Sequence, residues 1–337
     1  MNLLFSCIGK RGYIADYFRP HLAPGDRIIA TSNTPWTPGF RSADKGVLMP
    51  SYRSPEYRDA ILELCEMERI TGILSFMDED VAILSGFERE LKALGVTPIL
   101  PPAEVAKMCL DKWKAHCFFE SNRLATARSF IDLTAAKKAV AEGNLAYPLI
   151  VKPRSGFGSA NTWVARSNKE LEVFFEYQPD MLIQEMLGGD AYNIEILNDL
   201  DQRPIAVVPW RKFQSKLGET EQSITVESPE LVEYGQKLGR LVGHVGPMDV
   251  DLFVSDGVIS ILELNPRFGG GYPVSQLSGA DYPGLIVSML RGEDAMQTRK
   301  PYKPGVAMMK EIRPFGGDWE NLAKNDLHVE SPLNKRT

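Results

Sequence analysis

Short apolar runs alternate with helix-like segments through the first hundred residues, and this alternation restricts the fold more than any other feature of the sequence. The strand-like runs lie at 3–8, 27–31 and 72–76, and the helical patterns lie near 13–18, 55–68 and 81–94. Strands that alternate with helices are typical of βαβ units. The sequence therefore predicts a parallel α/β sheet at the N-terminus.

The turn after the first of these strands, Ile8 to Gly12, resembles a phosphate-binding turn, but it lacks the second glycine of the GxGxxG motif. A tight turn between a strand and a helix is the simpler interpretation, because glycine often serves that geometry alone. This turn would be the only evidence for a nicotinamide-dependent oxidoreductase, so we disfavour that function.

Composition and length restrict the class of protein. The 337 residues are 44% hydrophobic and 24% charged, which is enough to bury a substantial core in two or three lobes. No run approaches the roughly 18 apolar residues of a membrane span, and the N-terminus lacks a basic region and a cleavage site. The four cysteines form no CxxC pair, and a formal net charge of -6 disfavours non-specific binding to nucleic acid. We expect a cytoplasmic protein with neither a membrane nor a nucleic-acid partner, and a homodimer remains open.

A strand that ends in a lysine is followed at once by a glycine-rich turn. The strand is Tyr147 to Pro153 with Lys152 near its end, the turn is Arg154 to Ser159, and a second strand follows at Thr162 to Ala165. Backbone amides of glycine can approach phosphate oxygens closely, and the lysine adds a positive charge. The segment is typical of a hairpin that covers phosphates, and an ordinary hairpin with an exposed lysine is the alternative.

Four polar residues interrupt two apolar strands farther along the chain. They are Asp249 and Asp251 in the first strand, and Glu263 and Asn265 in the second. Alternation places each pair on one face of its strand. A three-residue connection at 255–257 would set Asp249 opposite Glu263 and gather all four, whereas a two-residue Asp-Gly turn would separate them. Gathered carboxylates need a positive partner, and Mg²⁺ prefers carboxylate oxygens together with nucleotide phosphates. We expect a magnesium site here, and an exposed polar face is the alternative.

A third segment is an apolar strand, Met181 to Leu187, that reaches an acidic, glycine-containing break at Gly188 to Asp190. Such a break between two lobes can offer backbone groups to adenine and an acid to the ribose hydroxyls. Any hinge between domains can have the same pattern, so the segment alone does not decide the function.

Together, in this order, these segments resemble the ATP-grasp superfamily. The resemblance is strongest to the ATP-binding half of the carbamoyl-phosphate synthase large subunit and related carboxylate-amine ligases. It spans residues 1–290, and its most specific element is Glu263-Leu-Asn265-Pro-Arg267. The residues that carry it are Asp111 and Lys112, Pro148 to Pro153, Arg154 to Ser159, Gln184 to Asp190, Asp251, and Glu263 to Arg267.

By this resemblance, ATP and Mg²⁺ are the cofactors. The expected nucleotide contacts are Lys112, Lys152, Ser155, Gly156, Gly158, Ser159, Glu185, Met186, Leu187 and Asp190, with adenine at 185–187 and ribose at Asp190. The expected magnesium ligands are Asp251, Glu263 and Asn265. The expected catalytic residues are Lys152 and Arg267, of which Arg267 would steady the transferred phosphoryl group or the acyl phosphate.

The resemblance also implies a mixed α/β and α+β fold, in which a Rossmann-like N-terminal lobe precedes a two-lobed ATP-grasp fold. The expected domains are the Rossmann-like lobe at 1–107, a small lobe with the glycine-rich loop at 108–186, and a large lobe with the metal site and a C-terminal extension at 187–337. The chain departs from its relatives at Asp251, where they often have glutamine or glutamate. It also has one ATP-grasp unit where the synthase subunit has two, so we do not expect complete carbamoyl-phosphate synthesis.

The implied activity is a ligation in which ATP converts a small-molecule carboxylate into an acyl phosphate that an amine or ammonia attacks. Basic side chains in the segment Trp210 to Thr220 are candidates for binding the anionic substrate, and Gly269 to Tyr272 could form the opposite wall. A solvated connection and a tight turn are the respective alternatives. The alternative function is a nucleotide-binding regulatory or scaffold protein that has kept the fold and lost turnover.

Overall fold

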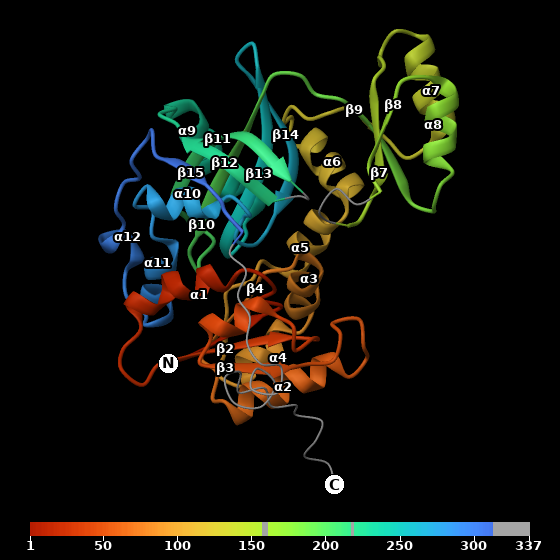
Figure 1. The fold of residues 1–337 in the computed structure, drawn as a ribbon. Helices are drawn as coiled ribbons and strands as arrows, with labels where there is room; N and C mark the ends of the chain where they lie inside the picture. The colour runs from red at the N-terminus through yellow and green to blue at the C-terminus, as the bar shows by residue number, and fades with distance from the viewer. Residues whose placement is uncertain (157–160, 217–218, 313–337) are drawn as a thin grey trace.

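Three sheets organise the chain in the computed structural model, which describes residues 1–156, 161–216 and 219–312 (Figure 1). The first is a five-stranded parallel sheet in the order β3-β2-β1-β4-β5. Its strands are β1 Asn2–Ser6, β2 Arg27–Ser32, β3 Lys45–Leu48, β4 Gly72–Ser75 and β5 Thr97–Pro98. The predicted parallel N-terminal sheet is therefore confirmed.

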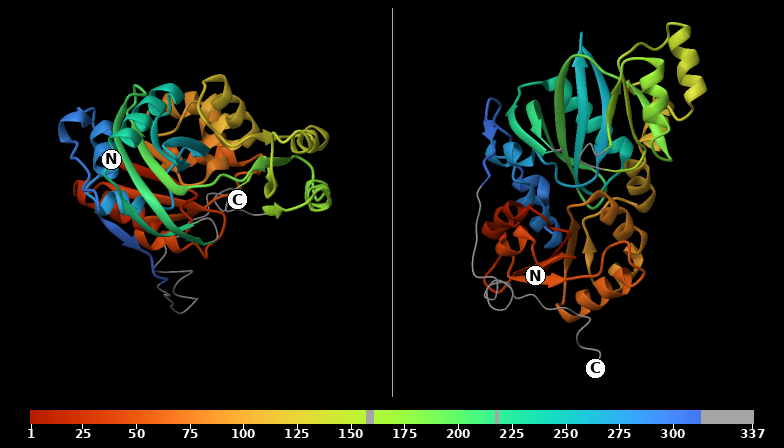
Figure 2. Two further views of the ribbon diagram at one scale, coloured as in Figure 1. Left: turned by 90° about the horizontal axis from the view of Figure 1, so that it is seen from above. Right: turned by 45° about the vertical axis from the view of Figure 1, so that its right-hand side comes forward.

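Both faces of this sheet are covered, because successive apolar side chains of its strands point to opposite faces. Leu4 of β1 packs with α2 Tyr57–Met67, α3 Asp78–Gly86 and α4 Glu88–Ala93. On the other face, Leu3 and Phe5 pack with α1 Gly12–Phe18 and with α11 Tyr282–Leu290. The short helices η1 Arg19–His21 and η2 Pro38–Ser42 complete this lobe. A helix from near the end of the described chain thus finishes the core of the N-terminal lobe (Figure 2).

A small lobe follows, with a four-stranded antiparallel sheet in the order β6-β9-β7-β8. The strands are β6 Ser129–Phe130, β7 Leu149–Pro153, β8 Trp163–Ala165 and β9 Met181–Glu185. Two helices, α7 Leu133–Ala141 and α8 Asn168–Phe175, begin at capping residues Asp132 and Ser167, whose side chains accept backbone N–H groups. Their apolar residues share one core with β7, β8 and β9.

The third sheet has six longer antiparallel strands in the order β14-β13-β10-β11-β12-β15. They are β10 Asp190–Asn198, β11 Pro204–Lys216, β12 Glu219–Thr225, β13 Gly246–Ser255, β14 Val258–Asn265 and β15 Ala307–Met309. One face is covered by α5 Ala103–Leu110, α6 Lys112–Ser121 and α9 Pro229–Val242. The helix α9 is capped by Ser228, and it ends at the left-handed Gly243. Short helices α10 Tyr272–Leu277 and α12 Ala295–Thr298 lie between β14 and β15 in sequence.

The packing adds a detail to the expected domain division. Although α6 precedes the small lobe in sequence, its Ala115 and Phe119 pack in the core of the six-stranded sheet. The segment 108–186 therefore does not pack as one body, and the division at 107 and 186 stays a proposal. Among the described residues, no helix is long and apolar enough to cross a membrane. The mixed fold class, with a parallel N-terminal lobe and two antiparallel lobes, is confirmed.

Candidate functional site

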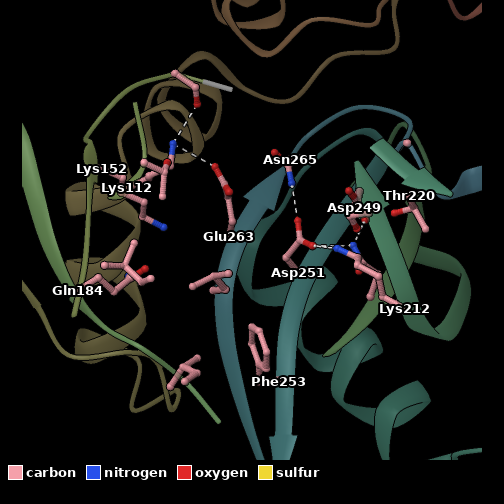
Figure 3. A pocket seen from close by; sticks show the side chains of 18 of the residues that line it. Lys112, Lys152, Gln184, Lys212, Thr220, Asp249, Asp251, Phe253, Glu263 and Asn265 are labelled. Carbon is pink, nitrogen blue, oxygen red and sulfur yellow. Dashed lines mark hydrogen bonds and ion pairs between the residues drawn. The ribbon is translucent and has the colours of Figure 1, made fainter. Parts of the chain in front are cut away.

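A cavity of about 710 Å³ lies where the three lobes meet (Figure 3). The small lobe contributes Lys152 of β7 and Gln184 of β9, and the N-terminal lobe contributes Arg11. The six-stranded sheet contributes polar side chains from β10, β11, β13 and β14. The cavity therefore has a cationic wall on the small-lobe side and an acidic floor on the large-lobe side.

The floor is a grid of polar residues on one face of three neighbouring strands. Register pairs Asn193 of β10 with Asp251 of β13, and Asp251 with Glu263 of β14. The next row is Glu195, Asp249 and Asn265. Directly opposed residues share a face, so all six side chains belong to the same side of the sheet.

The connection between β13 and β14 is not the three-residue connection that would gather these residues by simple alternation. Ser255 pairs with Val258, so the connection is the two-residue turn Asp256-Gly257, with φ values of 49° and 79°. Such a turn alone would put the two polar pairs on opposite faces. A β-bulge corrects this, because the register shifts between Asp251 and Leu252 and leaves Leu262 as an extra residue. The three-residue option is therefore wrong, and Asp249 lies opposite Asn265 instead of Glu263.

Lysines hold two carboxylates of the floor. Lys212 Nζ lies 2.5 Å from Asp251 Oδ1, and Asn193 and Asn265 donate to the same carboxylate at 3.1 and 3.2 Å. Burial raises the pKa of Asp251, but the Lys212 ammonium and the hydrogen bond from Asn193 outweigh burial, and the net pKa lies below its usual range. Lys112 Nζ lies 3.1 Å from Glu263 Oε1 and donates to the carbonyl of Gly156 at 2.9 Å.

Asp249 has the opposite electrostatic environment. It is 5% exposed, and burial together with the neighbouring Asp251 charge raises its pKa to about 6. Arg267 Nη1 lies 3.5 Å from Asp249 Oδ2, and Asn193 donates to Asp249 Oδ1 at 2.6 Å. Across the cavity, burial lowers the pKa of Lys152, which is 8% exposed. Lys152 thus brings a nearly desolvated cation to the site.

The donor set fits a hard divalent cation. Asp251, Glu263 and Asn265 present carboxylate and amide groups from one sheet face, and each of the two carboxylates is paired with a lysine ammonium group whose place a divalent cation could take. Within the described ranges, no group of three or more His, Cys, Asp or Glu side chains is itself arranged as a metal site. Phosphate and water oxygens would complete the coordination of Mg²⁺.

Most residues expected from the sequence meet at this cavity. Those that line it are Lys112, Lys152, Ser155, Gly156, Glu185, Met186, Leu187, Asp251, Glu263, Asn265 and Arg267. Asp190 is not among the lining residues, and its carboxylate lies 2.5 Å from Arg211 Nη2 instead. Gly158 and Ser159 lie outside the described residues.

Several residues of the site were missed in the sequence. Asn193 and Arg11 line the cavity although neither was expected in the site, and Gln184, which carried the resemblance without an expected role, lines it as well. Glu195 lies fully buried beside it, where burial and the Asp249 charge raise its pKa well above the usual range. Asn193 and Glu195 alternate with apolar residues in β10, as Asp249 and Asp251 do in β13, so the same polar interruption could have revealed them.

Comparison with known proteins agrees with this architecture. The family described as the PylC-like N-terminal domain matches residues 3–99, and the family described as the ATP-grasp domain matches residues 109–271. The arginine-specific carbamoyl phosphate synthase large chain of Geobacillus stearothermophilus is 20% identical over 304 residues, which cover 85% of this chain and 28% of the relative. The chain thus spans little more than a quarter of that relative.

Two further comparisons cover most of this fold. The D-alanine–D-alanine ligase of Leptospira biflexa is 24% identical over 238 residues, which cover 63% of this chain and 67% of the ligase. The biotin carboxylase domain of the Hydrogenobacter thermophilus 2-oxoglutarate carboxylase was solved with MgADP, ADP and bicarbonate. It superimposes with a TM-score of 0.68 at 17% identity, covering 91% of this chain and 72% of that one.

These relatives are ATP-dependent ligases and carboxylases that act on small molecules, and ATP-grasp enzymes use ATP and Mg²⁺. The lysines and the acidic floor meet at one cavity in the same part of the chain that the ATP-grasp family matches. Residues 109–271 therefore form an ATP-grasp domain, which follows a PylC-like N-terminal domain at residues 3–99.

Proposed function

We propose that this chain is an ATP- and magnesium-dependent ligase that activates a carboxylate as an acyl phosphate and joins it to an amine or to ammonia. One observation carries the proposal: Lys112 and Lys152 face Asp251, Glu263 and Asn265 across a single cavity (Figure 3). Cations for phosphates on one side and oxygen donors for a metal on the other match the needs of phosphoryl transfer. The carbamoyl phosphate synthase and D-alanine–D-alanine ligase relatives support this reaction class.

The chemistry requires activation because a carboxylate is a poor electrophile. Attack by an amine would have to expel oxide, whereas transfer of the γ-phosphoryl group of ATP gives a carbonyl with phosphate as leaving group. Lys112 and Lys152 would bind the nucleotide phosphates, and Glu185 to Leu187 would receive the adenine. Bound Mg²⁺ would be held by Glu263 and Asn265 with Asp251 and would neutralise phosphate charge. Arg267 would stabilise the oxygens of the phosphoryl group during transfer.

The two substrates would meet at the end of the cavity that is remote from β9. Arg11, Lys212, Thr220 and Gly270 line this end, next to Arg267. The cationic side chains suit a carboxylate, and the position beside Asp249 suits an amine that loses a proton when the C–N bond forms. Lys212 lies in the segment 210–220 that the sequence singled out for an anionic substrate.

The proposal is tested by measuring ADP release with pooled carboxylates and amines, followed by mass analysis of the product. The wild type should release ADP only when both a carboxylate and an amine are present. Glu263→Gln keeps the shape of the side chain but removes a metal-binding charge, so turnover should fall by about 10²- to 10³-fold. Circular dichroism and thermal melting check that this variant remains folded.

A regulatory or scaffold protein with this fold would give a different result. It would bind MgATP with the affinity expected of the site, yet no carboxylate and amine pair would release ADP. Equal turnover in the wild type and in Glu263→Gln would contradict the metal site even if turnover itself is found.

A further inference from the structure

The guanidinium of Arg267 is held by two lobes at once. Its Nη1 faces Asp249 of the large lobe at 3.5 Å, and its Nη2 lies 3.3 Å from Asp78 Oδ2 of the N-terminal lobe. The Arg267 and Asp78 side chains are 11% and 17% exposed, so solvent screens this contact only weakly. Carboxylates at both nitrogens fix the orientation of the guanidinium, which one partner alone would leave free to rotate.

The backbone on both sides of this contact is also fixed. Arg11 Nη1 donates to the carbonyl of Phe268 at 2.8 Å and to the carbonyl of Phe76 at 3.2 Å. The rings of Phe76 and Phe268 stack with an interplanar angle of 19° and centroids 6.2 Å apart. The residue after Arg267 is thereby fastened to the segment that leads into α3, where Asp78 is the first residue.

Asp78 itself stands on a rigid base. Two residues later in α3, the fully buried Asp80 accepts hydrogen bonds from Tyr57 at 2.6 Å and from Ser75 at 2.7 Å. Tyr57 also contacts Ser6 of β1 at 2.9 Å. The first turn of α3 is thus tied to the parallel sheet, which restricts the backbone of Asp78.

We propose that Asp78 is a positioning residue of the N-terminal lobe that orients Arg267 toward the transferred phosphoryl group. Asp78 does not line the cavity, so it acts through Arg267, which does. The inference rests on the proposed function, because it assigns Asp78 a part in that phosphoryl transfer. It gives the N-terminal lobe a catalytic purpose besides completing the cavity wall: a misplaced guanidinium would bind ATP as before but stabilise the transition state less.

The test compares neighbouring carboxylates on the first turn of α3. Asp78→Asn keeps the size but removes the charge, so kcat should fall by about 10- to 100-fold, as expected for a misplaced catalytic group. The affinity for MgADP, measured by titration, should stay at its wild-type value. Glu79→Gln removes a charge from the same helix turn without an Arg267 contact, and its kcat should match the wild type. Asp78→Glu restores the charge and should recover part of the loss.

Three results would overturn the inference. The first is a kcat of Asp78→Asn equal to that of Glu79→Gln, and the second is an equal loss in Asp78→Asn and Asp78→Glu. The third is a loss of MgADP affinity as large as the loss of kcat, which would indicate a general structural role. If Asp78→Asn does not fold, Asp78→Ser is measured by the same criteria. A wild type without turnover would refute the proposed function and the inference together, whereas an active wild type with an active Asp78→Asn refutes the inference alone.

Discussion

The two faces of the six-stranded sheet are made by the same strands, yet they have opposite chemistry. On the helix-covered face, Ile194, Ile196, Val250, Leu252 and Leu264 are buried in one apolar core under α5, α6 and α9. On the cavity face, the residues between them are the six polar side chains of the grid. The stability of the sheet and the chemistry of the cavity therefore both depend on the register of the strands, because a slip by one residue exchanges the two faces.

The largest effect should come from a deletion that moves the last residue of β14 from the cavity face to the apolar face. Removing Leu264 places Asn265 opposite Val250 on the apolar face and removes a buried leucine. Loss of the leucine and burial of an unpaired amide should together lower the free energy of unfolding by about 4 kcal/mol or more. Urea unfolding measures this change. A variant as stable as the wild type would show that the stability of the sheet does not depend on the register of β14.

An effect of intermediate size should come from Asp249 on the cavity face, where the free energy of unfolding should depend on pH. Asp249 binds a proton more tightly in the folded protein, since its pKa rises from 3.8 to about 6. Its stabilising contribution is complete below pH 3.8 and is lost as the pH rises through 6. Asp249→Asn cannot ionise, so between pH 4 and 7 it should gain up to about 3 kcal/mol of unfolding free energy relative to the wild type.

Urea unfolding in EDTA at several pH values measures this difference. Because Asp249 and Asp251 interact, the transition belongs to the pair. Asp256→Asn is the matched control, since its carboxylate is exposed in the turn at the far end of the same strands. A constant difference between Asp249→Asn and the wild type from pH 4 to 7 would contradict the buried, charge-repelled environment of Asp249.

The smallest effect should come from deleting Leu262. Strict alternation predicts that this deletion is as harmful as that of Leu264. Because Leu262 is the extra residue of the bulge, its removal should leave Asp251 opposite Glu263, with both still on the cavity face. The free energy of unfolding should change by about 1 kcal/mol. Instability comparable to that of the Leu264 deletion would show that the bulge itself holds the strands together.

The bulge also shows where prediction from sequence ends. Periodicity was sufficient for the parallel sheet, for the strand that ends near Lys152, and for the polar residues of β13 and β14 as a cluster. It could not decide how the cluster forms, because a bulge depends on the packing of Ile261 and Leu264 against helices distant in sequence.

Contacts between lobes were even harder to predict from the sequence. Arg267 and Asp78 are 189 positions apart, and their meeting depends on how two finished lobes dock. Asp190 illustrates the reverse case, since its place after a glycine-containing break predicted a ribose contact. In the structure a neighbouring strand supplies Arg211, which pairs with the carboxylate, and no local pattern records that partner.

The helix α11 has a consequence for how the protein is made. Its apolar residues complete the core around Leu3 and Phe5, although synthesis separates them from these strands by more than half the chain. While a ribosome is still producing the middle of the protein, α1 covers this face of the first sheet without α11, and part of its apolar surface therefore stays exposed to solvent. That interval is the period in which the nascent chain depends most on chaperones, and in which a slow stretch of translation would favour aggregation.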